Sequence, residues 1–506
     1  MHNVSAPPRT RGARTMNISK SSYMQLRQCR KLFWLARHRK AAGEADETSP
    51  RMEQGRRVEE LARDLFPAGV AVNHEQAFSG VMADSNNALR DATSDRPIFQ
   101  AVVHAEGLLA EVDILMPRKK GVFDIYEVKS STEVKDEHLH DVAFQRHVCI
   151  AAGLDVRKCF VVHVDSGYVR NGDVDPEKLF KIVDVTPLVV PLAAEVEANI
   201  RAADRIVAAK TPPDIDIGPH CSDPQPCPFA DECWGHVHKE PKNIFTLSRL
   251  GQKAWPLYRG GVIRSADIPV SFKLSDKQRL QLRAEKTGRP HFGAAEIASF
   301  LARLERPLHY LDFETFQTAI PIFEASSPWQ QIPFQFSVHV KAAAGSKPRH
   351  HSWVWDGDGD PRQILLEKLE PVLSSAGSIV VYNQGFELGV LSKCCDAFPE
   401  SRKWFDAVRP RFVDLLEPFR SFAAYHPDQH GSASIKSVLP AWVGKDYDGM
   451  EISDGSMASD EFTRVMFGDV PDAERRRVVA ALEEYCGQDT EGMIWIVDAL
   501  DRRIRK

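Results

Sequence analysis

The spacing of hydrophobic residues changes along this chain between a helical and a strand-like period. Near the N-terminus, the apolar residues of Tyr23–Leu35 fall on one helical face and basic residues on the other, which predicts an amphipathic helix. Residues 51–66 predict a second helix. The period then shortens to two, which predicts a β-hairpin or a β-meander. Its strands are expected at 99–104, 108–115 and 122–130.

Helical and strand-like segments alternate through the rest of the chain. After the meander we expect a helix at 136–152, a strand at 158–164 and a helix at 192–209. Two short helical patterns follow, at Phe245–Leu257 and Lys277–Lys286. Beyond them, strand patterns surround a single helical pattern. The strands are expected at 308–313, 333–340, 350–355 and 378–382, and the helix at 361–374.

This order of elements predicts an α/β protein with two domains, which a chain of 506 residues also favours. The divisions follow the changes of pattern along the chain. We expect a disordered leader at 1–15, a first domain at 16–240, a helical connector at 241–305 and a second domain at 306–506.

Two acids stand at alternate positions in the strand that opens the second domain. Because side chains of a strand point alternately to opposite faces, Asp312 and Glu314 lie on the same face. Neighbouring carboxylates repel each other, and a divalent cation between them removes the repulsion. A solvated acidic strand face is the alternative for this pair taken alone.

Further polar residues follow later in the second domain. Glu387 comes after the strand at 378–382, at the carboxyl end where α/β sheets place their ligands. This acid is therefore directed at the same region as the acidic pair. Tyr485 and Asp489 are four residues apart in a helical segment, so they share one helix face.

A second group of acids lies in the meander. Asp113 stands at the end of one expected strand, and Glu127 and Lys129 share a face of the next. Two acids can hold Mg²⁺, and a lysine beside them can orient or deprotonate a water. The alternative is a surface strand with a chance Glu–Lys pair, because this tripeptide pattern is common.

Three cysteines recur at six-residue intervals in a proline-rich segment, at Cys221, Cys227 and Cys233. Thiolates clustered in this way hold zinc or an iron–sulfur cluster. A fourth ligand is needed, and Cys29 on the N-terminal helix is our candidate. Histidines are the alternatives, and they would favour zinc: His220, His236 and His238.

The formal net charge of the chain is −5, so any binding to nucleic acid requires a local basic patch. Residues 1–40 contain such a patch, with ten Arg or Lys and no Asp or Glu. Arg27, Arg30 and Lys31 are expected to lie along a nucleic-acid backbone. No apolar run is long enough to span a membrane and no signal peptide is visible, so we expect a cytoplasmic protein.

The first 240 residues resemble the RecB-like branch of the PD-(D/E)XK nucleases, in particular iron–sulfur members related to the CRISPR adaptation exonuclease. The resemblance rests on Asp113, Glu127 and Lys129, with one cysteine before this core and three after it. It implies a restriction-endonuclease-like fold and a [4Fe-4S] cluster that staples the two ends of the domain. The cluster ligands would be Cys29, Cys221, Cys227 and Cys233.

The same resemblance assigns roles to single residues. Asp113 and Glu127 would bind the metal, and Lys129 and Gln145 would be catalytic. Two positions depart from the family pattern. Cys149 stands where an aromatic residue is expected, and the upstream histidine has no match. Glu59 or Glu60 would take its place as an acidic ligand.

Residues 306–506 resemble DEDD-type 3′–5′ exonucleases, which have a ribonuclease-H-like fold. The motifs are Asp312-x-Glu314, Asn383-x-x-Phe386-Glu387 and Tyr485-x3-Asp489. The last is that of the tyrosine subclass, so Tyr485 would orient the attacking water. The second motif normally ends in Asp, whereas this chain has Glu387.

The whole arrangement is similar to an uncharacterised bacterial family of double-nuclease proteins. It implies an α/β protein in which a PD-(D/E)XK core is followed by a ribonuclease-H-like mixed sheet with flanking helices. The expected function is metal-dependent hydrolysis of nucleic acid, with DNA favoured over RNA and Mg²⁺ or Mn²⁺ at both centres. The alternatives are a nucleic-acid-binding protein with weakened sites and an iron–sulfur regulatory protein.

Overall fold

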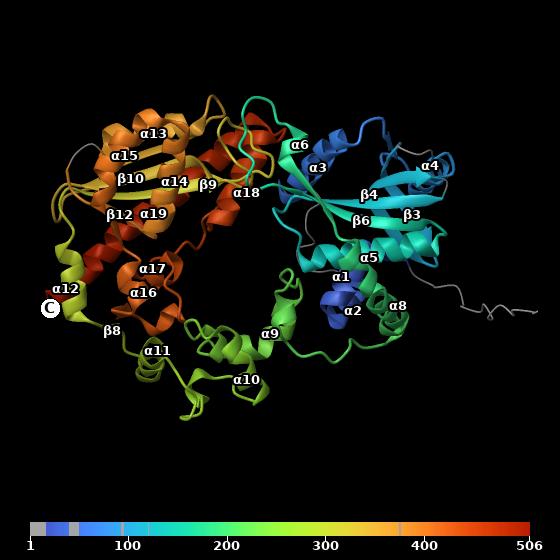
Figure 1. Ribbon diagram of the computed structural model, residues 1–506. Coiled ribbons are helices and arrows are strands. Elements are labelled where there is room, and N and C mark those ends of the chain that lie inside the picture. The colour runs from blue at the N-terminus through green and yellow to red at the C-terminus, as the bar shows by residue number, and fades with distance from the viewer. Residues whose placement is uncertain (1–16, 40–49, 93–95, 120, 374–375, 506) are drawn as a thin grey trace, which may run out of the picture. The chain divides into compact units, whose positions relative to one another are not determined.

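The computed structural model describes residues 17–39, 50–92, 96–119, 121–373 and 376–505. The expected leader at 1–15 lies outside these ranges. The chain is a mixed α/β protein with two compact units (Figure 1). The first unit runs to Trp234 and includes 319–322, and the second comprises 235–318 and 323–506. The segment expected as a connector, 241–305, belongs to the second unit.

A seven-stranded mixed sheet lies at the centre of the first unit. Its strand order is β2-β3-β4-β5-β6-β7, and β1 pairs with β4. The three expected meander strands are confirmed, but β4 continues to Lys119, so Asp113 lies inside the strand rather than at its end. The strands are β1 (Ile18–Ser19), β2 (Val70–Ala71), β3 (Ile98–Ala105), β4 (Leu108–Lys119), β5 (Val122–Lys129), β6 (Asp155–Val164) and β7 (Phe180–Asp184).

Helices cover this sheet because its central strands are apolar on both faces. Helix α5 packs against β3, β4 and β6, and α3 contacts β5. The expected helices at 51–66, 136–152 and 192–209 are confirmed. The helices of this unit are α1 (Lys20–Gln28), α2 (Arg30–His38), α3 (Pro50–Ala62), α4 (Phe78–Arg90), α5 (Asp136–Ala151), α6 (Pro176–Leu179), α7 (Thr186–Val189) and α8 (Ala193–Ala208).

The N-terminal helix is not continuous, and our expectation of one helix over Tyr23–Leu35 is wrong. The chain is extended at Cys29, with φ −160° and ψ 124°, and this residue separates α1 from α2. The side chain of Gln28 explains the break. Its amide nitrogen donates to the carbonyl oxygens of His220 at 2.9 Å and Gln225 at 2.7 Å. These bonds tie the helix end to the cysteine-rich segment.

The second unit contains a five-stranded mixed sheet of order β11-β10-β9-β12-β13. Strands β9, β10 and β11 are antiparallel, whereas β12 and β13 run parallel to β9. The four expected strands are confirmed, and β13 was not expected. The strands are β9 (Leu308–Phe316), β10 (Ile332–Lys341), β11 (Arg349–Val354), β12 (Ile379–Val381) and β13 (Phe412–Asp414).

The two faces of this sheet have different cover (Figure 1). Helices α13 (Pro361–Leu373), α14 (Gln384–Ala397) and α15 (Arg402–Val408) pack their apolar side chains on the face that includes Leu311 and Phe313. The long helix α19 (Asp472–Ile504) contacts β9, β10 and β11. Because side chains alternate along β9, the neighbours of Leu311 and Phe313 point to the face with α19.

The segment 245–257 does not form the expected helix. It consists of short turns followed by α10 (Ala254–Arg259), because Arg249 and Gly251 both have left-handed φ angles of 53°. The expected helix at Lys277–Lys286 is confirmed as α11 (Asp276–Thr287), which begins with a capping box at Ser275. Within the described ranges, no helix combines the length and apolar character needed to cross a membrane.

The remaining elements complete the second unit. Helix α9 begins at the end of the first unit and continues into the second. Strands β8 (His291–Phe292) and β14 (Ala424–Tyr425) pair with each other. The other helices are α9 (Ala230–His238), α12 (Ala294–Ala302), α16 (Glu417–Ser421), α17 (Ile435–Val443) and α18 (Gly455–Phe467).

Candidate functional site

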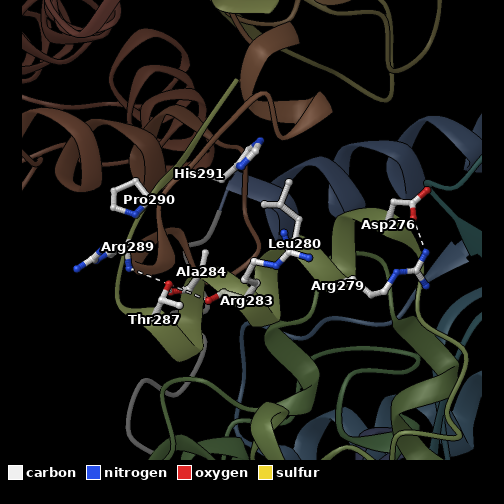
Figure 2. Close-up of a pocket in the computed structure, with 9 residues that line it drawn as sticks. All are labelled: Asp276, Arg279, Leu280, Arg283, Ala284, Thr287, Arg289, Pro290 and His291. Atoms are coloured by element: carbon white, nitrogen blue, oxygen red, sulfur yellow. Dashed lines mark hydrogen bonds and ion pairs between the residues drawn. The ribbon is translucent and has the colours of Figure 1, made fainter. Parts of the chain in front are cut away.

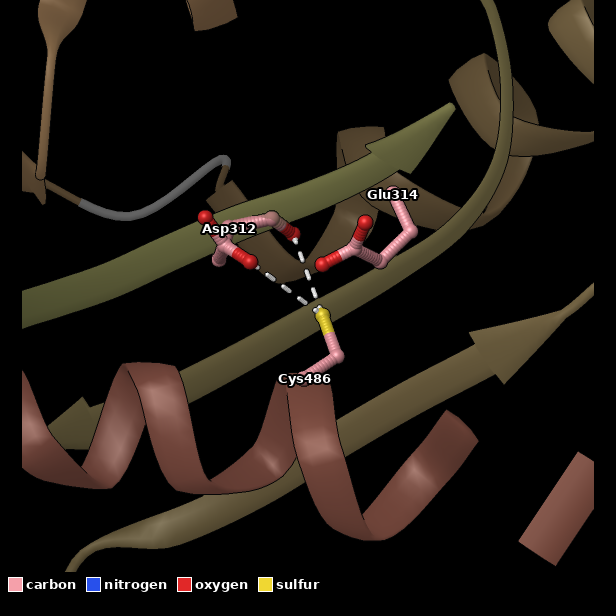
Figure 3. A group of neighbouring side chains, drawn as sticks. All are labelled: Asp312, Glu314 and Cys486. Carbon is pink, nitrogen blue, oxygen red and sulfur yellow. Dashed lines mark hydrogen bonds between the residues drawn. The ribbon is translucent and has the colours of Figure 1, made fainter. Parts of the chain in front are cut away.

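Two acids of β9 and one thiol of α19 meet between the sheet and the helix. Asp312 and Glu314 point to the same face of the strand, as expected, and Cys486 approaches them from the helix (Figure 3). One ligand atom from each residue lies within 4.8 Å of the others. The thiol donates to Oδ2 of Asp312 at 3.5 Å. No pattern in the sequence marked Cys486 as a member of this group.

Asp489 joins the acids one helical turn beyond the thiol. Its carboxylate accepts hydrogen bonds from the hydroxyl groups of Tyr447 and Tyr485. Burial raises the pKa of Asp489 to about 6, although these hydroxyl groups and the charge of Lys436 act in the opposite direction. The expected pairing of Tyr485 and Asp489 on one helix face is therefore present.

Glu387 reaches the same group from the first turn of α14, directly after β12. Its side chain is 1% exposed, and Oε2 has no hydrogen-bond partner among the described residues. Burial and the nearby charge of Asp312 raise the pKa of Glu387 well above its usual range. A buried carboxylate oxygen without a partner is costly unless it binds a proton or a cation.

The electrostatics of the four acids favour a bound cation. Burial raises the pKa of Asp312 and Glu314 well above the usual range, and the neighbouring carboxylates raise them further. Lys436 is the nearby cation, with Nζ 5.1 Å from the ring centroid of Tyr485. One lysine does not balance four carboxylates. The donor set of oxygen atoms and the orphaned oxygen of Glu387 therefore fit one or more divalent metal ions.

Tyr447 and Lys436 were not anticipated from the sequence. Tyr447 lies in an irregular segment between α17 and α18, and Lys436 lies near the start of α17. Neither residue belongs to a periodic pattern that would have marked it. Lys436 could have been noticed, because it is the charged residue of a helix that is otherwise mostly apolar.

The first unit brings its expected site residues together around Glu127. Lys129 Nζ lies 2.5 Å from Glu127 Oε1 and 2.7 Å from Asp141 Oδ2. The amide nitrogen of Gln145 donates to Glu127 Oε2 at 2.6 Å and to Asp141 Oδ1 at 2.9 Å. Asp113 lies on the adjacent strand, where Oδ2 accepts from the backbone N–H of Val128 at 2.7 Å.

A second lysine, Lys20 of α1, completes this group. Its ammonium donates to Glu127 Oε1 at 2.9 Å. Burial alone would raise the pKa of Glu127, but Lys129 and Lys20 outweigh burial and hold it far below the usual range. Asp113 has the opposite behaviour, because burial and the charge of Glu127 raise its pKa. Glu127 is thus already compensated by two lysines, whereas Asp113 is not, and this group is a weaker fit to a divalent metal than the group in the second unit.

Sequence reasoning missed Lys20 and Asp141 in this group. Asp141 could have been found, because it is four residues before Gln145 on the expected helix and shares its face. Glu59, one of two proposed substitutes for the missing histidine, lies near Glu127 and has its pKa raised by burial and by Glu127. Glu60 is exposed.

The four expected cysteines line a single cavity in the first unit. They are Cys29, Cys221, Cys227 and Cys233, and none forms a disulfide. Burial raises the pKa of the Cys29 thiol, and the neighbouring thiols contribute. Backbone N–H groups of Lys31 and Leu32 point to the sulfur of Cys29. Four thiols around one cavity are the ligand types of a four-thiolate centre, either iron–sulfur or zinc, although no three of their sulfur atoms lie within 4.8 Å of one another.

The histidines considered as alternative ligands separate in the structure. His220 lines the cysteine cavity. His236 instead lies 2.8 Å from the hydroxyl of Tyr258 through Nε2, and neither His236 nor His238 is among the residues around this cavity. The cavity is thus lined by all four expected cysteines and by one of the three histidines.

Only some of the basic residues that were expected to contact a nucleic-acid backbone are exposed and without another contact in the described part of the chain. Arg27 forms an ion pair with Asp136, and Lys31 lines the cysteine cavity. Arg30 is exposed. Another patch member, Lys40, lies outside the described residues.

A basic groove that the sequence did not reveal lies along α11 in the second unit. It encloses a cavity of about 330 Å³, lined by Arg279, Arg283, Arg289 and His291 (Figure 2). Arg279 pairs with Asp276. The guanidinium groups of Arg283 and Arg289 have no acidic partner within the described part of the chain. The helical spacing was visible in the sequence, but the loop residues that close the groove were not.

A known protein family matches part of the second unit, but the description of that family gives no function. Residues 309–434 match a protein family described as "Domain of unknown function (DUF2779)". This range includes Asp312, Glu314 and Glu387 and ends before Tyr485 and Asp489. The chain is also similar to "Uncharacterized protein MG366 homolog" of Mycoplasma pneumoniae (strain ATCC 29342 / M129 / Subtype 1), with 25% identity over 224 residues. That similarity covers 40% of this chain, and the chain spans about a third (33%) of that relative's length.

Proposed function

We propose that this chain is a metal-dependent nuclease whose principal centre is formed by Asp312, Glu314, Glu387 and Asp489. The convergence of these acids from β9, α14 and α19 carries the proposal. Three of them are buried and Asp312 is half-buried, and Lys436 alone cannot neutralise them. Divalent cations are the usual partners of such carboxylate groups, and phosphodiester hydrolysis is the chemistry they support.

The residues around the acids have separate roles in this proposal. A divalent cation held by the acids would lower the pKa of a water and stabilise charge on the leaving oxygen of a phosphodiester. Tyr447 holds the Asp489 carboxylate in place through its hydroxyl group. The hydroxyl of Tyr485 reaches the same carboxylate and is positioned to orient a water. Lys436 reduces the repulsion among the acids.

The fold of the second unit supports a relationship to DEDD-type 3′–5′ exonucleases. A mixed five-stranded sheet with helices on both faces is what the ribonuclease-H-like resemblance implies. The three sequence motifs also lie together, since Asp312 and Glu314, then Glu387, then Tyr485 and Asp489 share one electrostatic group. Glu387 in place of Asp keeps a carboxylate at this position, with one additional methylene.

The first unit supports a RecB-like centre less directly. Asp113, Glu127, Lys129 and Gln145 are neighbours, which agrees with the resemblance to PD-(D/E)XK nucleases. Lys20, however, adds a second ammonium to Glu127. This observation favours a second candidate function, in which the first unit binds nucleic acid and cleaves it weakly or not at all. The cysteine cavity supports a [4Fe-4S] cluster, with zinc as the alternative, that joins α1 and α2 to residues 221–233.

The substrate class follows from charge. The groove of α11 supplies the local basic surface that a chain of net charge −5 needs for a polyanion. We favour DNA over RNA as the substrate. We also expect the protein to act in the cytoplasm, because none of its nine cysteines forms a disulfide in the described part of the chain.

The test is hydrolysis of end-labelled single- and double-stranded DNA and RNA with Mg²⁺ or Mn²⁺. Asp312→Ala is expected to reduce release from the 3′ end by about 100-fold or more, since even partners of metal ligands contribute 10–100-fold. Lys129→Ala reports on the first unit, and Glu400→Gln, at an exposed acid of the second unit, is the matched control. Activity that survives the double variant Asp312→Ala/Lys129→Ala, or a wild-type protein without metal-dependent hydrolysis, overturns the proposal.

A further inference from the structure

A thiol lies where the acids of the second unit converge. Cys486 is fully buried on α19, and its sulfur is within 4.8 Å of carboxylate oxygens of both Asp312 and Glu314. Figure 3 shows the sulfur directed from the helix toward the two carboxylates. The resemblance to exonucleases assigns no role to this position. The thiol is therefore a feature of this chain that the proposed hydrolysis does not use.

A second, independent observation indicates that the group is built for a ligand. Glu387 is 1% exposed and its Oε2 has no partner among the described residues, although Asp312 lies close enough for their charges to interact. A buried acceptor left unpaired next to other acceptors cannot be satisfied by them, because each of these oxygens lacks a proton when ionised. A cation at the group would satisfy the oxygens of Asp312 and Glu314 directly and would lower the electrostatic cost of Glu387 nearby.

The sulfur changes which cation this group prefers. Mg²⁺ takes oxygen ligands almost exclusively, whereas thiolate sulfur favours Zn²⁺ and chemically similar ions. Two carboxylates and one thiolate form a mixed donor set of the kind that binds zinc. As a metal ligand, a thiol at this position is of no use to an exonuclease that binds Mg²⁺ alone.

We propose that Asp312, Glu314 and Cys486 form a binding site for Zn²⁺ or a similar thiophilic divalent cation, and that this cation competes with Mg²⁺ for the two carboxylates. On binding, the thiol releases its proton to solvent and the sulfur donates an electron pair to the metal. Binding by this donor set stands without the proposed nuclease function, whereas its consequence, inhibition of hydrolysis by zinc, rests on that function.

The competing explanation is that Cys486 only positions Asp312 through its S–H···O contact of 3.5 Å. The substitution Cys486→Ser separates the two explanations. Serine retains a hydrogen-bond donor of similar size but lacks the soft sulfur ligand. A positioning role therefore survives the change to serine, and preferential binding of thiophilic metals does not.

The experiment is a titration of the full chain with Co²⁺, a spectroscopic substitute for Zn²⁺, that records thiolate-to-metal charge-transfer absorption. The four cysteines that line the cavity of the first unit are present in every variant, so their signal cancels in the difference from wild type. Cys394→Ser is the matched control, because this buried thiol of the second unit lies outside the acid group. Glu314→Gln removes an oxygen donor while leaving all cysteines in place.

Wild type and Cys394→Ser are expected to show one charge-transfer component that Cys486→Ser and Glu314→Gln lack. Excess Mg²⁺ should move this component to higher Co²⁺ concentrations. In hydrolysis assays, the Zn²⁺ concentration for half-inhibition should rise about 10–100-fold in Cys486→Ser. Cys486→Ala provides the same spectral comparison if the serine variant does not fold, because it also lacks the sulfur ligand.

Equal charge-transfer spectra for wild type and a folded Cys486 variant overturn the proposal. So does a wild-type spectrum without a component beyond that of the first-unit cysteines. Failure of the nuclease function has a different signature, because the spectral component is then present while hydrolysis is absent in all proteins.

Discussion

Replacing Asp489 by asparagine is expected to stabilise the metal-free protein at alkaline pH. This carboxyl is buried, and its pKa is about 6 instead of the ordinary 3.8. The folded protein therefore binds this proton more tightly than the unfolded chain. The resulting stability is fully present below about pH 4 and is lost as the pH rises through 6. Above pH 7 the ionised carboxylate opposes folding, and a neutral asparagine removes this opposition.

The size of the effect follows from the two pKa values. The difference between 3.8 and about 6 corresponds to about 3 kcal/mol, at about 1.36 kcal/mol for each pH unit. For a unit of this size, 1 kcal/mol changes the melting temperature by about 2 °C, so the expected increase is about 6 °C at pH 8. Several charged and polar groups face the Asp489 carboxyl and affect its ionisation. They are Lys436 of α17, Tyr447, Tyr485 and Cys486 of α19, and Asp312 and Glu314 of β9.

The assay is differential scanning calorimetry of the wild type and Asp489→Asn at pH 4 and pH 8 with a chelator. The melting transition of the second unit should rise in the variant at pH 8 and change little at pH 4. Asp469→Asn, at an exposed position before α19, is the control and should have no effect at either pH. Equal effects of Asp489→Asn at both pH values, or a lower melting temperature at pH 8, would refute the reasoning.

Three further predictions concern other parts of the chain. Changing Arg283 and Arg289 together to Ala should weaken DNA binding, measured by fluorescence anisotropy in the presence of a chelator. The slope of log affinity against log salt concentration should fall by about 1.4–1.8. An unchanged slope would contradict the binding of DNA in this groove. Cys29→Ser should release the metal of the cysteine cavity, measured by metal analysis per chain, whereas Cys159→Ser, outside the cavity, should retain it. Leu365→Ala, in the core of the second unit, should cost about 2–5 kcal/mol in urea unfolding, and a loss below about 1 kcal/mol would contradict the packing.

Local periodicity accounts for the parts of the site that the sequence predicted. Asp312 and Glu314 share a face because a strand has a period of two, and Tyr485 and Asp489 share a face because a helix turns every 3.6 residues. Glu387 could be placed because ligands collect at the carboxyl ends of strands. In each case a short segment contains the information, and the structure brings these segments together.

The residues that the sequence missed are those set by long-range contacts. Lys20 meets Glu127 across 107 positions of sequence, and Tyr447 meets Asp489 across 42. No local pattern marks such a partner, because the contact exists only after the sheet and helices have packed. The break at Cys29 has the same origin, since Gln28 is held by carbonyl groups that lie more than 190 positions later.

Helix α1 connects the group around Glu127 with the cysteine cavity of the first unit. Its first residue, Lys20, reaches Glu127, and the residue after its last turn, Cys29, lines the cysteine cavity. Nine helical residues make a stiff strut of about 13 Å between these two points. Removal of the proposed metal would leave this end of α1 held to the cysteine-rich segment by the hydrogen bonds of Gln28, and would weaken the support of the ammonium at the other end. Because such coupling is reciprocal, charge changes at Glu127 would in turn alter the affinity of the cysteines for the proposed metal.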